Sequence, residues 1–224
     1  MRKRKEILEI LAKAQRIDAE YELFGASKHG YRLNDPIKID FVHQAEEKYG
    51  FILPEDYVQF ITQVGDGGAG PDYGIYPFVD FLTKADNLST ESWKESYRQS
   101  LSKLLTLHPM QAGEVEEYAI VTREGYEKNP GKYFIHEIEE DNLGNTEGFF
   151  VLGTHGCQWD FGLILSGERR GQVFDTDNEG GYGFVADSFD VFYQSWLDWI
   201  ADEKRLWEEL EARRRMFQER KSGS

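Results

Sequence analysis

The chain has 224 residues, and its 41 acidic and 26 basic side chains give it a net charge of −15 at pH 7. Hydrophobic residues make up 40% of the chain and aromatic residues 14%, which excludes a disordered protein and predicts one globular domain with an aromatic core. The single cysteine, Cys157, excludes an internal disulfide framework and a zinc site built from several cysteines, as fits a reducing compartment.

The acidic charge is concentrated in the middle of the chain. Residues 1–20 carry six basic and four acidic groups, and residues 204–224 carry seven and four, so the total of −15 leaves −20 for the residues between them. Such a field repels nucleic acids and anionic membranes and attracts cationic partners. The alternative, that acidity only keeps the protein in solution, stays equally open on charge alone.

The first predicted element is a long amphipathic helix that ends at Gly25. Its apolar residues recur at helical spacing: Ile7, Ile10, Leu11, Ala14, Ile17, Tyr21 and Phe24. Charged residues interrupt this stretch, so it is not the apolar region of a signal peptide. No run approaches the roughly 18 apolar residues that a membrane span needs. We therefore expect a soluble, cytoplasmic protein.

Two further helices are expected before a loop rich in glycine. One begins at the capping residue Asp40, and the next begins at Pro54 and should bury one face, formed by Tyr57, Phe60, Ile61 and Val64. Five glycines then crowd residues 65–74, ahead of an aromatic strand. This loop lacks the strand, the lysine and the helix that surround a phosphate-binding loop, and Asp66 would repel phosphate, so a structural turn is favoured.

The second half of the chain indicates a sheet between two helices. A helix is expected over residues 88–107, and Ser188 should cap a last helix whose apolar stripe covers one face of the sheet. Short β-branched or aromatic segments separated by turn signals predict about six antiparallel strands: residues 118–122, 132–138, 148–152, 159–165, 172–174 and 182–185. The predicted fold class is therefore α+β, an antiparallel sheet flanked by helices.

The predicted organisation has three parts. Residues 1–38 form an N-terminal amphipathic helix and link, residues 39–202 form the α+β domain, and residues 203–224 form a C-terminal helix and a flexible tail. Trp207, Leu210 and Phe217 continue the apolar stripe among arginines, so the C-terminal helix either packs on the N-terminal one or lies exposed.

Two short patterns resemble chemical sites, and neither is specific. One matches alternate ligand positions of a calcium loop: Asp175, Asp177 and Glu179. The glutamate expected at the twelfth position is Ala186, so an acidic hairpin turn is favoured. The other is His155 with Cys157, whose separation by one glycine does not by itself bring a base and a thiolate together. We predict no metal site, no cofactor and no catalytic residue.

Two blocks of sequence resemble the SUKH superfamily, also called the Smi1/Knr4-like domain. Residues 46–76 read EEKYGFILPEDYVQFITQVGDGGAGPDYGIY, with a glycine before Leu-Pro, an acidic and aromatic helix, and a loop that ends in Gly-Pro and an aromatic-Gly pair. Residues 148–165 read GFFVLGTHGCQWDFGLIL and are similar to a later segment of the family. The resemblance covers roughly residues 40–200, with Gly65-Asp66-Gly67 standing where relatives often carry Asn-Gly.

The resemblance implies a binding protein rather than an enzyme. Bacterial members are typically immunity proteins that neutralise polymorphic toxins such as nucleases or deaminases, and fungal members regulate through protein contacts. With the acidic charge, this predicts a protein partner, a basic toxin domain, and no nucleic acid or membrane. The alternative is a regulatory or scaffold module without a toxin. The predicted contact residues are acidic or aromatic and lie in loops or at strand ends: Asp66, Asp72, Tyr73, Asp175, Asp177 and Glu179.

Overall fold

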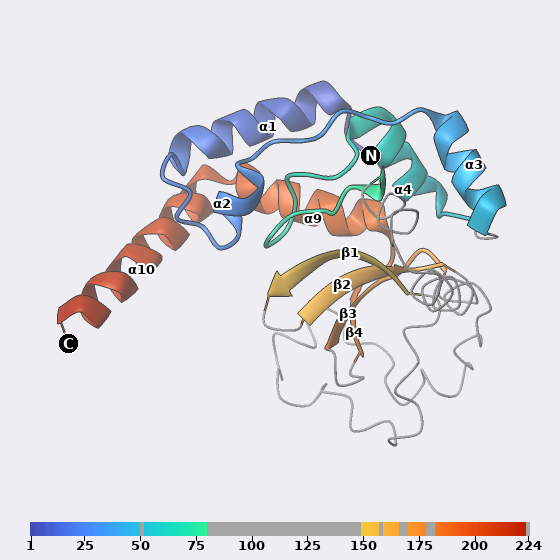
Figure 1. The fold of residues 1–224 in the computed structure, drawn as a ribbon. Helices are drawn as coiled ribbons and strands as arrows, with labels where there is room; N and C mark the ends of the chain where they lie inside the picture. Colours follow the sequence, from blue (N-terminus) through green and yellow to red (C-terminus); the bar gives the residue numbers. More distant parts are fainter. Residues whose placement is uncertain (50–51, 80–148, 157–158, 166–169, 178–181, 223–224) are drawn as a thin grey trace, which may run out of the picture.

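A layer of helices covers one face of a four-stranded antiparallel sheet (Figure 1). The computed structural model describes residues 1–49, 52–79, 149–156, 159–165, 170–177 and 182–222. The strands are β1 (Phe149–Gly156), β2 (Trp159–Ile164), β3 (Val173–Asp177) and β4 (Tyr182–Ala186), and they neighbour one another in chain order. The α+β class and the meander are thus confirmed.

The described sheet has four strands, where the sequence predicted about six. The helix expected over residues 88–107 and the strands expected over 118–122 and 132–138 lie outside the described residues. The four later strands lie where the sequence placed them, because their alternating apolar residues and glycine-rich turns are local signals.

The helical layer consists of segments from both ends of the chain. Its N-terminal members are α1 (Arg4–Ile17), α2 (Ala26–His29), α3 (Ile39–Tyr49), α4 (Glu55–Gln59) and the π-helix η1 (Phe60–Val64). Its C-terminal members are α9 (Phe189–Ala201) and α10 (Glu203–Ser222). Helix α9 lies between α1 and the sheet (Figure 1). Ser188 caps α9 as predicted, because its hydroxyl accepts a hydrogen bond from the backbone N–H of Val191 at 3.2 Å.

The prediction that the first helix continues to Gly25 is wrong. Helix α1 ends at Ile17, and the next residue, Asp18, is fully buried. Its carboxylate accepts hydrogen bonds from the backbone N–H groups of Glu22 and Leu23 and from the hydroxyl of Tyr31, the last at 2.8 Å. These bonds stabilise a turn in place of further helix, which is the competition that short acidic side chains offer to helical backbone.

The core is centred on aromatic side chains from α4, η1 and α9. The ring of Phe60 lies 4.9 Å from that of Phe189 and 4.7 Å from that of Tyr193, measured between centroids. The predicted apolar face of the third helix is confirmed, since all four of its residues are buried: Tyr57, Phe60, Ile61 and Val64. The helix differs in detail, because Pro54 caps it and its last turn is a π-helix.

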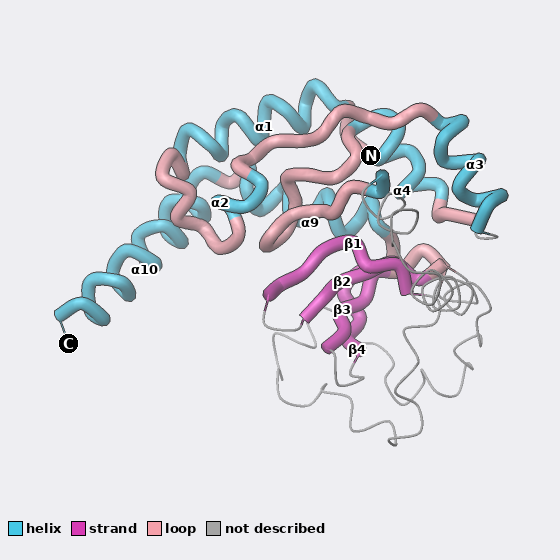
Figure 2. The backbone as a smooth tube through the Cα atoms, in the orientation of Figure 1, coloured by secondary structure: helices cyan, strands magenta, loops and turns pink. Residues whose placement is uncertain are grey.

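Both terminal helices belong to this body, but α10 also runs beyond it (Figure 2). The side chains of Leu206 and Leu210 are buried in the same core as those of Ile7 and Leu11 of α1. Farther along α10, Met216 and Phe217 are exposed, as is Trp207 on another side of the helix. The C-terminal helix therefore does both things that the sequence left open, packing at its start and lying exposed at its end.

Replacing Tyr57 with phenylalanine should leave the protein as stable as before, or more stable by up to about 1 kcal/mol. The Tyr57 side chain is completely buried, and its hydroxyl finds no hydrogen-bond partner in the described part of the chain. Removing an unsatisfied buried hydroxyl removes a desolvation cost and leaves the ring packing intact. Urea denaturation of the two proteins measures the difference, and a loss above 1 kcal/mol would contradict the prediction.

Candidate partner-binding surface

The loop of residues 65–78 is fixed to both layers of the fold. Its two arms pair with each other through Gly68 and Ile75, whose N–H and carbonyl groups exchange two hydrogen bonds of 2.8 Å. The backbone N–H of Tyr76 donates to the carbonyl of Leu152 in β1 at 2.7 Å. On the opposite side a methyl group on Gly25 would overlap the carbonyl of Asp72, so only glycine permits α2 to lie this close. The loop is therefore a rigid platform.

Asp66 was predicted as a contact residue because its loop should be exposed, and that expected exposure is wrong. Only 4% of Asp66 is accessible to solvent. Its carboxylate accepts hydrogen bonds from the backbone N–H groups of Phe78, at 2.7 Å, and Val79, at 3.2 Å. The carboxylate is buried because it satisfies two backbone donors at the end of the loop. Asp66 is thus a structural residue of the platform.

Asp72 and Asp175, in contrast, meet at the same place, on the two sides of His155. Nδ1 of His155 is hydrogen-bonded to Asp72, and Nε2 is hydrogen-bonded to Asp175 at 2.7 Å. His155 stands at an irregularity of β1, since Thr154 pairs with Asp160 and Gly156 with Trp159 while His155 has no partner in the register. Such a bulge re-aims the side chain, here across the ring of Phe161, which lies 5.0 Å away.

The two carboxylates keep His155 charged. Burial alone would lower the pKa of its imidazole, but the hydrogen bonds and charges of Asp175 and Asp72 outweigh burial and raise the pKa to about 10. Both ring nitrogens therefore donate, and the cluster carries one net negative charge. The ring therefore has no free lone pair with which to act as a base, and its two N–H groups link the loop to β3.

Tyr73 extends this cluster as an aromatic edge. Its ring lies 5.1 Å from that of Phe24, and its ring also covers Gly156, where a side chain would collide with it. Arg213 of α10 lies over the other aromatic ring, 5.9 Å from the centroid of Phe24. Phe24 and Tyr73 thus form a partly exposed aromatic edge beside the Asp72–His155–Asp175 cluster.

The structure brings together three of the six predicted contact residues: Asp72, Tyr73 and Asp175. The backbone of Asp177 lies in β3 and pairs with that of Trp159. Glu179 and Cys157 lie outside the described residues. Reasoning from sequence considered His155 only beside Cys157 and missed its position between the two aspartates. A histidine next to glycine in an aromatic strand was the available signal, but the aspartates stand 83 and 20 residues away in sequence.

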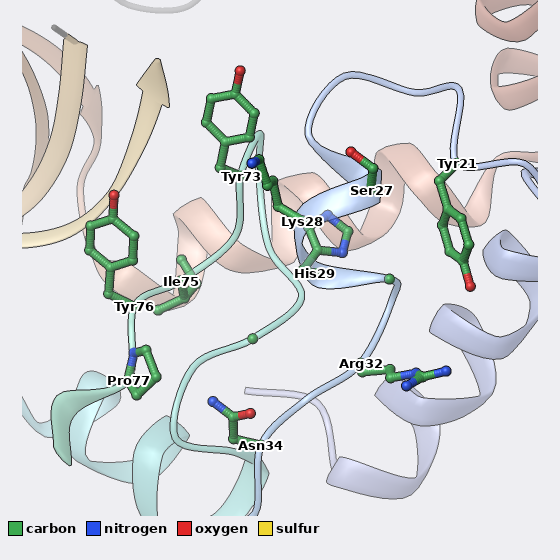
Figure 3. Close-up of a pocket in the computed structure, with 12 residues that line it drawn as sticks. Tyr21, Ser27, Lys28, His29, Arg32, Asn34, Tyr73, Ile75, Tyr76 and Pro77 are labelled. Carbon is green, nitrogen blue, oxygen red and sulfur yellow. The ribbon is translucent and has the colours of Figure 1, made fainter. Parts of the chain in front are cut away.

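A shallow hollow of about 610 Å³ adjoins Tyr73 (Figure 3). One wall is formed by the loop, from which the rings of Tyr73 and Tyr76 extend in a similar direction, and the other by Lys28 and the turn that follows α2 (Figure 3). Ile75 and Gly68 also line the hollow, and their mutual hydrogen bonds hold this part of the loop in place. Tyr73 lines the hollow and also forms the aromatic edge beside the aspartate cluster, so it links the two.

The profile of the SMI1/KNR4 family (SUKH-1) matches residues 36–195. The chain belongs to this family. The match includes the loop, β1 and β3, and hence every member of the Asp72–His155–Asp175 cluster, while α1, the end of α9 and all of α10 lie outside it. A search of curated proteins found no match to the chain.

Two features of this SUKH-1 protein concern metal ions and membranes. In the described ranges, no group of three or more His, Cys, Asp or Glu side chains has the geometry to hold a metal ion. None of the helices in those ranges combines the length and the apolar character that crossing a bilayer requires.

The free energy of unfolding should be greatest near pH 6.5, because His29 and His155 change it with pH in opposite directions. Burial lowers the pKa of His29 to about 4, whereas the pKa of His155 is raised to about 10. From pH 6.5 to 10 only the folded protein keeps the His155 proton, so stability falls as the pH rises. From pH 6.5 down to 5 only the unfolded chain protonates at His29, so stability falls as the pH drops. Each slope is at most about 1.4 kcal/mol per pH unit.

Urea denaturation between pH 5 and pH 9.5 measures this profile. His155→Gln should flatten the alkaline side alone, and His29→Gln should flatten the acidic side alone. An alkaline slope unchanged in His155→Gln would show that His155 is not the group responsible.

Proposed function

We propose that this SUKH-1 protein is a non-enzymatic binding protein that neutralises a cognate polymorphic toxin by covering the toxin's active surface. Family membership is the observation that carries the proposal, since the matched region contains the whole aspartate cluster. A nuclease or deaminase toxin needs a basic surface for its nucleic-acid substrate. An acidic protein associates rapidly with such a surface and competes for it.

The preorganised cluster supports this function. Asp72 and Asp175 are about 30% exposed at their side chains, and His155 fixes both. The net negative charge can therefore meet a lysine or arginine of the partner without first being ordered, which reduces the entropic cost of binding. The neighbouring edge of Phe24 and Tyr73 offers the aromatic contact that dominates many interfaces.

Co-expression with toxin domains encoded beside the gene tests the proposal. The protein should restore growth and bind one such domain in a pull-down, with an association rate that falls steeply as salt is added. If no neighbouring toxin domain binds and none is neutralised, the proposal is wrong.

A pair of variants locates the contact. Tyr73→Ala should weaken toxin binding by about tenfold to a hundredfold, because it removes an aromatic ring from the proposed interface. Trp207→Ala removes an aromatic ring of α10 that is 44% exposed and should leave toxin binding unchanged. Equal losses in the two variants would argue against the proposed surface. Thermal unfolding of both proteins shows whether either loss reflects folding.

The second candidate is a regulatory or scaffold module without a toxin, and the end of α10 favours it. Met216 and Phe217 are exposed on a basic helix that runs past the body, a pattern typical of helices that enter a partner's groove. In that case Phe217→Ser would abolish partner binding and Tyr73→Ala would not. The two functions therefore predict opposite results for Tyr73→Ala.

A further inference from the structure

The hollow beside Tyr73 differs in charge from the rest of the protein. We call it the tyrosine hollow and define it by Tyr21, Lys28, Arg32, Tyr73 and Tyr76 (Figure 3). Acidic residues outnumber basic ones 41 to 26 over the whole chain, yet the described residues that line this hollow include no carboxylate. Its charged groups are the ammonium of Lys28 and the guanidinium of Arg32.

These two cations are available to a ligand. Both side chains are exposed, and neither forms an ion pair with any residue in the described ranges, whereas Arg2, Arg4 and Arg214 each do. The third basic residue of the wall, His29, is neutral at physiological pH because burial lowers its pKa to about 4. The hollow therefore presents two positive charges that no ion pair within the described ranges neutralises.

The backbone around both cations is fixed. Lys28 donates its N–H to the carbonyl of Gly25 at 2.8 Å. Arg32 donates its N–H to the carbonyl of His29 at 3.0 Å and accepts from the N–H of Ala69 at 2.7 Å. The turn that carries the cations is thus hydrogen-bonded to the loop that carries the tyrosines. Binding in the hollow orders side chains alone, which lowers its entropic cost.

The residue types are those of a protein-binding surface. Tyrosine, serine, glycine, asparagine and arginine make up most of the lining, as in the binding loops of antibodies. Tyr76 is 45% exposed, and its hydroxyl, like that of Tyr73, extends from the loop (Figure 3). Hydroxyl, ammonium and guanidinium groups all donate hydrogen bonds, and the anionic acceptor that an unmodified protein partner offers to such a set is a carboxylate.

We propose that the tyrosine hollow receives an acidic, extended segment of the protein partner, while the adjacent Asp72 and Asp175 meet basic residues of the same partner. This inference rests on the proposed function and names the chemistry of recognition. A lysine or arginine placed in the hollow would face Lys28 and Arg32, and such like-charge contacts are strongly unfavourable. Alternating the sign of charge over neighbouring patches fixes one orientation of the partner and rejects toxins that are merely basic.

The first test needs no toxin. Acetylated tetraglutamate and tetralysine peptides are titrated into the full-length, isotope-labelled protein, and backbone amide shifts are recorded by NMR. Tetraglutamate should shift amides of residues 27–32 and 73–76, and the shifts should vanish in Lys28→Glu/Arg32→Glu and at high salt. Shifts confined to other residues, no shifts at all, or the same shifts with tetralysine would overturn the inference.

The second test uses a toxin identified by co-expression. Lys28→Glu/Arg32→Glu should weaken its binding about a hundredfold, because each reversal places like charges together. Arg205→Glu, which reverses an exposed charge outside the hollow, should change binding less than about twofold. Unchanged binding by the double variant would overturn the inference and leave the toxin-binding function standing. If no toxin binds at all, the proposed function fails, and the peptide titration still decides the chemistry of the hollow.

Discussion

Replacing Asp66 with alanine should destabilise the protein by about 3 kcal/mol, one of the two largest effects that the structure predicts. The Asp66 carboxylate is the acceptor for two backbone donors, the N–H groups of Phe78 and Val79. Alanine removes the carboxylate that accepts from both donors, and such a loss costs about 1–3 kcal/mol for a buried group. Phe78 is itself fully buried against the core, so the donors cannot turn toward water without moving its ring.

Urea denaturation measures this loss, and two variants separate its causes. Asp35→Ala removes a carboxylate that is 99% exposed and paired with Arg4, so it should cost less than about 1 kcal/mol. Asp66→Asn retains one oxygen acceptor, so its loss of stability should lie between those of Asp66→Ala and Asp35→Ala. If Asp66→Ala were as stable as Asp35→Ala but bound the partner poorly, Asp66 would be a contact residue after all.

Replacing His155 with leucine should destabilise the protein by about 2–4 kcal/mol and disorder the tip of the loop. The substitution removes the imidazolium between Asp72 and Asp175, so two partly buried carboxylates face each other without a counter-charge. His43→Leu, at an exposed histidine of α3, provides the matched control and should have little effect. Urea denaturation gives the loss, and amide hydrogen exchange at residues 71–75 reports the loop.

The carboxylates themselves supply the decisive control. Changing Asp72 and Asp175 to asparagine in the leucine variant removes the repulsion and should restore at least half of the lost stability, although each single asparagine variant of the natural protein is destabilised. Additive losses across these variants would mean that the three side chains do not act as one unit.

Elements with local signals could be predicted from the sequence. The buried face of α4 and η1, the cap at Ser188 and the four described strands all follow from spacing within a few residues. The end of α1 could not be predicted, because Tyr21 and Phe24 continue the helical spacing by coincidence. Only the fold shows that Asp18 has backbone donors and the Tyr31 hydroxyl within reach, and that these bonds stabilise a turn there.

The surface could be predicted only in part, because its chemistry depends on distant residues. A loop rich in glycine and aspartate indicates exposure, which is correct for Asp72 and wrong for Asp66. The two residues differ because the Asp66 carboxylate accepts hydrogen bonds from backbone N–H groups in the fold, and no local sequence pattern predicts those bonds. The role of His155 requires three segments to meet, and a strand irregularity aims its side chain at the meeting point. Charge counts likewise predicted an acidic surface and gave no sign of the cationic hollow within it.

The packing of α1 on α9 and α10 has a consequence for the order in which the protein forms. The apolar side chains of Ile7, Leu11 and Ala14 are made first, and the helices that bury them are made last. At a synthesis rate of roughly 5–20 residues per second, the interval between α1 and α9 is on the order of ten to forty seconds. During that interval α1 has no α9 to pack against. The complete body, and the loop platform attached to it, can therefore form only after α9 has left the ribosome, so a shortened chain that retains every residue of the loop would still lack the proposed binding surface.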